Sequence, residues 1–125
     1  MVRLRKTRLI AILVLGTAAH GARGGEVEIT AARAECGAGR CTFHVALRHA
    51  DTGWDHYADL WRVLAPDGTE LGRRVLYHPH VDEQPFTRSQ TLAVPRDLDH
   101  VLIEAHDKVH GYARRRFRLN LPEQR

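Results

Sequence analysis

Apolar and polar side chains alternate along most of the chain after residue 25, and this period of two predicts β-strands rather than helices. The expected strands lie at residues 26–33, 41–49, 56–65, 70–77, 86–95, 100–107 and 112–121. Turn-forming residues separate them, and the segment PDGT is a strong hairpin signal between the third and fourth strands. No helical periodicity of any length occurs in the sequence after its N-terminal segment.

Short strands at this regular spacing are typical of a two-sheet antiparallel sandwich of the immunoglobulin or fibronectin kind. The sequence therefore predicts an all-β domain over residues 26–121, a seven-stranded antiparallel immunoglobulin-like β-sandwich. Trp61 lies in the middle of the third expected strand and is the natural aromatic centre of the core. A small Greek-key barrel is the alternative architecture.

The first residues have the order of a secretory signal peptide, with a basic stretch, an apolar run over residues 9–15 and then small residues. The apolar run is much shorter than the roughly 20 residues that a bilayer-spanning helix needs. We expect residues 1–19 to be a signal peptide cleaved after Ala19, with Gly21 or Ala22 as alternative positions, and the protein to be periplasmic or secreted. An uncleaved anchor in the membrane interface is the alternative.

Loss of the signal peptide changes the charge balance of the protein. Residues 1–19 contain four of the 19 basic residues and none of the 15 acidic ones, which leaves 15 of each. A nucleic-acid-binding protein needs a basic patch, and the local candidate, Arg114–Arg118, would divide its charges between two faces of a strand. We therefore expect a monomer with no nucleic-acid partner and no membrane span.

The two cysteines, Cys36 and Cys41, are separated by the turn-forming residues GAGR and flanked by expected strands. In an exported protein an even pair favours a disulfide, and this spacing fits a bridge across the mouth of a hairpin. Closing so short a loop stabilises the fold by about 2 kcal/mol in the chain-entropy model. A redox pair would more often have the spacing Cys-x-x-Cys, and a zinc site would need further ligands nearby.

Three connections carry much of the polar chemistry of the chain, namely residues 49–56, 78–86 and 106–112. In an up-and-down tracing all three fall at the same end of the sandwich, where loops of such folds often carry recognition. Six of the nine histidines lie in these connections: His49, His56, His78, His80, His106 and His110. We expect the three loops to converge.

Neutral imidazole binds zinc, copper or nickel well near neutral pH, so the convergence suggests a metal site. His78 and His80 face the same side if the backbone is extended, which Pro79 favours. His106 and His110 flank a tight connection and could close toward the same point. The expected ligands for zinc or copper are His78, His80, His106 and His110, with Asp107 or Glu83 completing the shell.

Simpler explanations exist for several of these polar residues. His49 and His56 can be polar surface residues of a turn, and Asp107 can bond its own backbone two residues further on. Glu83 can pair with Arg88 and order the loop around it. A metal-free polar network or a partner-binding surface therefore remains an alternative to the metal site.

Catalysis is not indicated by the sequence. Ser89 lies within an expected strand and lacks a nucleophile-elbow turn, and a glycine-rich phosphate loop is absent from the sequence. We therefore expect a binding protein rather than an enzyme. The alternative function is a metal-free accessory module that presents Trp54, Tyr57 and Tyr112 to an envelope protein or glycan.

The segments HPHVDEQPFTRS and HDKVHGY resemble small exported bacterial proteins with an immunoglobulin-like sandwich. The similarity covers roughly Trp54 to Leu121. It implies a periplasmic β-domain and carries no activity or functional residue over to this chain.

Overall fold

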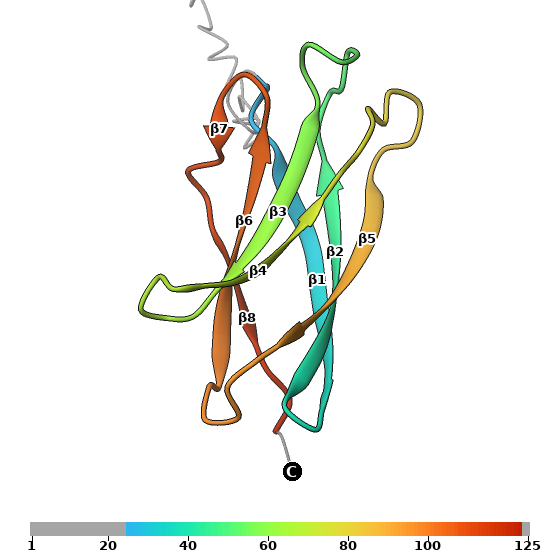
Figure 1. The fold of residues 1–125 in the computed structure, drawn as a ribbon. Coiled ribbons are helices and arrows are strands. Elements are labelled where there is room, and N and C mark those ends of the chain that lie inside the picture. The colour runs from blue at the N-terminus through green and yellow to red at the C-terminus, as the bar shows by residue number, and fades with distance from the viewer. Residues whose placement is uncertain (1–24, 124–125) are drawn as a thin grey trace, which may run out of the picture.

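The structure is a computed structural model that describes residues 25–123, and over this range the chain forms two antiparallel sheets (Figure 1). The three-stranded sheet has the order β1 (Glu28–Gly37), β2 (Arg40–Arg48) and β5 (Phe86–Ala93). The five-stranded sheet has the order β4 (Glu70–Val75), β3 (Ala58–Leu64), β6 (His100–Asp107) and β7 (Gly111–Tyr112), with β8 (Phe117–Asn120) also paired to β6. The predicted all-β class is confirmed.

The predicted signal peptide, residues 1–19, lies outside the described residues. Within residues 25–123, no helix has the length and apolar character needed to cross a bilayer.

The core lies between the inner faces of the two sheets. In β2 every second side chain is buried, from Cys41 to Leu47, and β6 buries Val101, Ile103 and Ala105 in the same alternating way. Trp61 of β3 is fully buried among them, as the sequence predicted. Burial of each large apolar side chain contributes about 1.5–3 kcal/mol, so this alternation is the main determinant of the fold.

The β1–β2 hairpin carries the predicted disulfide. Cys36 and Cys41 are direct partners in the strand register, and their sulfurs are bonded with the Cα atoms 4.1 Å apart. The turn between them uses positive φ angles at Ala38 and Gly39. The bridge therefore ties the two strands at the mouth of a hairpin, and β1 runs further than the expected residues 26–33.

The expected last strand, residues 112–121, is divided into β7 and β8, so the predicted number of strands is wrong by one. The register explains the interruption. Tyr112 pairs with His106 and Phe117 pairs with Ile103, so four residues of the later segment lie opposite two residues of β6. The Ala113 amide still donates to the Ala105 carbonyl at 2.9 Å. Pairing with β6 resumes at Phe117.

The β2–β3, β4–β5 and β6–β7 connections all lie at the same end of the molecule, as the topology predicted (Figure 1). The first described residue, Gly25, also lies there, because its carbonyl oxygen contacts the ring of His49. We call this end the loop pole. It brings together residues that are far apart in the sequence.

Candidate metal centre

His49 is buried at the loop pole, with 2% of its surface exposed, so its interpretation as a surface residue is wrong. Its backbone amide donates to the side chain of Gln84 at 2.9 Å. Its ring Nδ1 contacts Asp51, and its Nε2 donates to the Gly25 carbonyl at 2.6 Å. A carbonyl oxygen only accepts, so Nε2 carries a hydrogen here, and a metal bound at this atom would replace that hydrogen.

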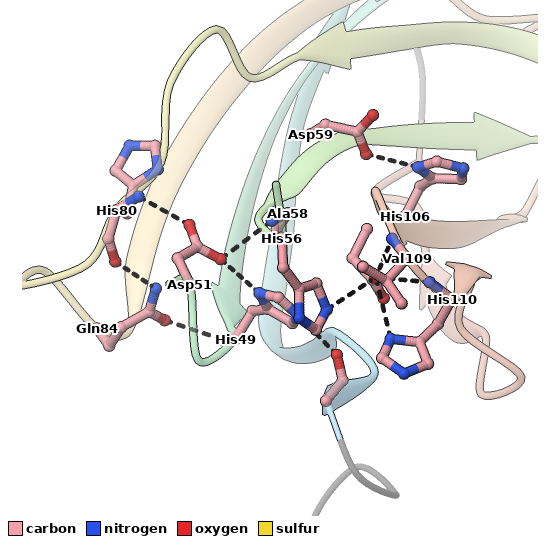
Figure 2. Close-up of polar contacts among 12 residues, drawn as sticks. His49, Asp51, His56, Ala58, Asp59, His80, Gln84, His106, Val109 and His110 are labelled. Carbon is pink, nitrogen blue, oxygen red and sulfur yellow. Dashed lines mark hydrogen bonds and ion pairs between the residues drawn. The ribbon is translucent and has the colours of Figure 1, made fainter. Parts of the chain in front are cut away.

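Asp51 joins the β2–β3 connection to its neighbours (Figure 2). One carboxylate oxygen contacts His49 and accepts the Ala58 amide at 3.0 Å, at the start of β3. The other accepts the His80 amide at 2.7 Å, from the β4–β5 connection. A carboxylate that accepts a hydrogen bond from one ring nitrogen of a histidine fixes the orientation of the ring. This is the usual arrangement when the other ring nitrogen binds a metal.

Asp107, the last residue of β6, is fully buried and forms the centre of the polar cluster. Its Oδ1 accepts the amides of Val109 and His110 at 2.9 and 2.8 Å, which confirms the predicted turn. The same oxygen lies 3.1 Å from His56 Nε2 and 3.1 Å from His110 Nδ1. Its other oxygen, Oδ2, is buried and has no hydrogen-bond partner among the described residues.

The carboxyl of Asp107 stays ionised despite its burial. Burial is the largest single influence and raises the pKa, but hydrogen bonds from the amides of His110 and Val109 and from the His110 ring outweigh it and lower the pKa below its ordinary value. A buried negative charge with one unpaired oxygen is costly unless a cation or further donor compensates it. Oδ1 of Asp107 is therefore well supplied with donors, whereas Oδ2 has none among residues 25–123.

Three possible ligand atoms, one each from His49, His56 and Asp107, lie within 4.8 Å of one another. The ring of His110 adjoins them, with its centroid 5.1 Å from that of His56. Ligands bound tetrahedrally at about 2.1 Å from a metal are about 3.4 Å apart, so small side-chain movements would close the group onto an ion. We call these four residues the Asp107 cluster.

Gly25 covers one side of the Asp107 cluster. A β-carbon at this position would lie 3.0 Å from Cε1 of His110 and 3.1 Å from Cε1 of His56. The φ angle of +102° also favours glycine over other residues. The backbone can therefore approach the imidazole rings closely only because this residue has no side chain.

The predicted ligands are not gathered into one group. His78 and His80 pair with each other, with ring centroids 4.5 Å apart, and His80 stacks on Phe86 at 3.8 Å. Figure 2 shows His80 well separated from His106 and His110. Of the six predicted residues, only Asp107 belongs to a group of three possible ligands among residues 25–123, and His110 adjoins that group.

His106 lies on the outer face of the five-stranded sheet, because successive residues of a strand point to opposite faces and Asp107 points inward. Its Nδ1 contacts Asp59 at 2.5 Å. Glu83 pairs with Arg88 at 3.6 Å, as the alternative interpretation expected, and its side chain is largely exposed.

His80 also has a hydrogen-bond partner within the protein. Arg88 donates to its Nε2 at 2.9 Å, which makes that nitrogen an acceptor. Burial lowers the pKa of His80 below its ordinary value, and the positive charge of Arg88 acts in the same direction. The neutral ring therefore packs as an aromatic side chain against Phe86.

The three aromatic residues predicted to bind a partner do not share one surface. Trp54 is 66% exposed, whereas Tyr57 is buried beneath it at a centroid distance of 5.8 Å. Tyr112 lies under the guanidinium of Arg62, 3.9 Å from its ring centroid, and beside His106.

His49 and His56 were not among the predicted ligands, and the sequence contained a signal for His49 and for the inward orientation of Asp107. In β2 the buried positions are all odd-numbered, and His49 continues that series one step beyond the strand. In β6 the odd-numbered positions are also buried, and Asp107 continues them while His106 does not. Extending the alternation of each strand into its loop would have selected His49 and Asp107 as inward-facing residues.

No family model matches the chain, and no solved structure matches it. Over 70 residues the chain is 49% identical to a protein of Halomicrobium mukohataei named "Putative lipoprotein". The match covers 56% of this chain and 34% of that relative, so the matched segment spans about a third of the relative's length.

Proposed function

We propose that this protein binds a divalent transition metal ion at the loop pole, through His49, His56 and Asp107, with His110 as the fourth ligand. The observation that carries the proposal is the buried, ionised Asp107, which has two imidazole nitrogens on one oxygen and, among residues 25–123, no partner on the other. The β2–β3 connection supplies His49 and His56, and the end of β6 with the connection after it supplies Asp107 and His110. Burial of the unpartnered Oδ2 is costly, and a cation bound at this atom would offset that cost.

The donor set favours zinc or copper. Two or three imidazole nitrogens and one carboxylate oxygen suit zinc, copper, iron or nickel, whereas calcium and magnesium prefer shells made of oxygen. Both cysteines are in the disulfide, so thiolate ligands are not available to the ion. Asp51 behind His49 would hold that ring in the orientation that presents Nε2.

The proposed location is the cell envelope or outside the cell. A disulfide persists in oxidising compartments, and the relative in Halomicrobium mukohataei is named as a lipoprotein. The predicted signal peptide agrees with this location. We also propose that the two sheets form an immunoglobulin-type sandwich, because β1, β2 and β5 face β4, β3 and β6 across one core.

A metal titration of the protein freed of metal by a chelator tests the proposal. Zinc or copper at 100 times its dissociation constant should raise the free energy of unfolding by about 2.7 kcal/mol and increase the melting temperature. His56→Gln should reduce this gain strongly, and the exposed His78→Gln should leave it unchanged. No shift with zinc, copper or nickel above pH 7 would overturn the proposal.

A second candidate function is supported by the apolar residues of the loop pole. Trp54, Tyr77, Val81 and Val109 are exposed and come from all three connections. Exposed apolar side chains gathered at one end often mark a contact surface for a protein or glycan. Titration with envelope glycan fragments should change Trp54 fluorescence, and Trp54→Phe should abolish the change because Trp61 is buried.

A further inference from the structure

The two outer strands of the three-stranded sheet differ in how their edges are protected. The edge of β5 faces β4, where Arg74 donates to the Ser89 carbonyl at 3.1 Å. Gly72 also packs so closely there that a β-carbon would lie 2.3 Å from a methyl carbon of Leu92. The five-stranded sheet therefore closes this side of the molecule.

The edge of β1 lies near β8 and β6 of the other sheet but pairs with neither. No other strand among residues 25–123 pairs with its outer side. The strand is ten residues long, and it contains neither proline nor lysine, which are common protections of a sheet edge. A register shift falls between Ile29 and Ala31, and from Ala31 to Gly37 the pairing with β2 is regular. A long, regular edge of this kind is a template for another strand.

The side chains along β1 favour one particular partner. Arg33 and Glu35 point to the outer face on either side of Ala34, and they are already paired with each other at 2.5 Å. If a second β1 strand runs antiparallel with Ala34 opposite Ala34, each Arg33 lies directly opposite a Glu35. The small side chains of Ala31, Ala32 and Ala34 leave room for a close approach.

We propose that β1 pairs with β1 of a second copy of this chain, so that the two three-stranded sheets become one continuous sheet across a two-fold axis. Each copy presents the same surface, which is the requirement for a closed symmetric dimer. The interface would contain two reciprocal Arg33–Glu35 pairs in addition to the backbone hydrogen bonds. This pairing does not depend on the proposed metal site, which lies at the loop pole, and it is an alternative to the expected monomer.

Analytical ultracentrifugation of the naturally processed protein, with chelator present, tests the pairing. We expect a dimer that dissociates on dilution. Arg33→Glu should weaken dimerisation at least tenfold, because four acidic groups then meet, and Arg33→Glu with Glu35→Arg should restore it to within about threefold. Lys108→Glu, at an exposed residue of the β6–β7 connection, changes the net charge equally and should leave dimerisation unchanged.

Amide hydrogen exchange gives a second measurement that does not depend on any variant. Exchange of the β1 amides that face outward should slow as the protein concentration rises through the dimer range, while exchange in β4 should not change. A monomer at all concentrations up to the millimolar range overturns the proposal. So does a dimer that Arg33→Glu leaves intact.

Discussion

The histidines of the loop pole form two groups that differ in what surrounds them. In the Asp107 cluster, imidazole rings meet a buried carboxylate that also accepts two backbone amides. His80 packs on Phe86, and His106 pairs with Asp59 on an outer face, so each has a local partner. Sequence spacing treats all of these rings alike, whereas burial of the carboxylate makes the first group alone a candidate for metal binding.

The largest expected difference in stability comes from comparing the loss of Asp107 in the first group with the loss of Asp59, the partner of His106. Asp107→Ala should lower the free energy of unfolding by about 3–5 kcal/mol, because buried donors lose their acceptor. Asp59→Ala should lower it by less than about 1 kcal/mol, because its pair with His106 lies near the surface. Urea denaturation measures both, and equal losses would contradict the distinction between the groups.

A smaller effect is expected at Asp51. Asp51→Asn keeps one acceptor oxygen but removes the charge beside His49, and it should cost about 1.5–3 kcal/mol in urea denaturation. Asp99→Asn is the matched control, because Asp99 also pairs with a neighbouring histidine, His100, but is largely exposed. The control should show no measurable loss of stability; a loss as large as that of Asp51→Asn would show that burial is not the cause.

Zinc affinity should respond differently to substitution of His110 and of His106, which the sequence predicted as equivalent ligands. His110→Gln should weaken zinc binding at least tenfold, about 1.4 kcal/mol, because its ring adjoins Asp107. His106→Gln should change it by less than twofold, because that ring faces the other side of the sheet. Isothermal titration calorimetry measures both, and the opposite order would favour the ligand set predicted from the sequence.

The smallest expected effect is a pH dependence that arises from His80. Its pKa is lowered in the folded protein from an ordinary value of about 6.5, so below that pH the unfolded chain binds more protons. Stability of the metal-free protein should therefore decline as pH falls from about 6.5 toward the folded pKa. His80→Gln should flatten this slope and leave the dependence above pH 7 unchanged, as measured by urea denaturation at each pH.

Much of the fold could be predicted because its causes are local. Alternation identified most of the strands, PDGT and GAGR identified two turns, and Trp61 identified the core. The division of the last strand could not be predicted from that pattern. It depends on two extra residues between Tyr112 and Phe117, which shift the pairing with β6 and have no signature in the alternation.

The sequence by itself determined that the chain is all-β, that Cys36 and Cys41 close a hairpin, and that three polar loops share one end. These follow from periodicity, turn chemistry and chain direction. Only the tertiary structure decided which polar side chains meet, because a strand places each residue on one of two faces and burial then selects among them. His49 and Asp107 point inward and His106 points outward, so the candidate site forms around a carboxylate that the sequence predicted only as completing a shell of histidines.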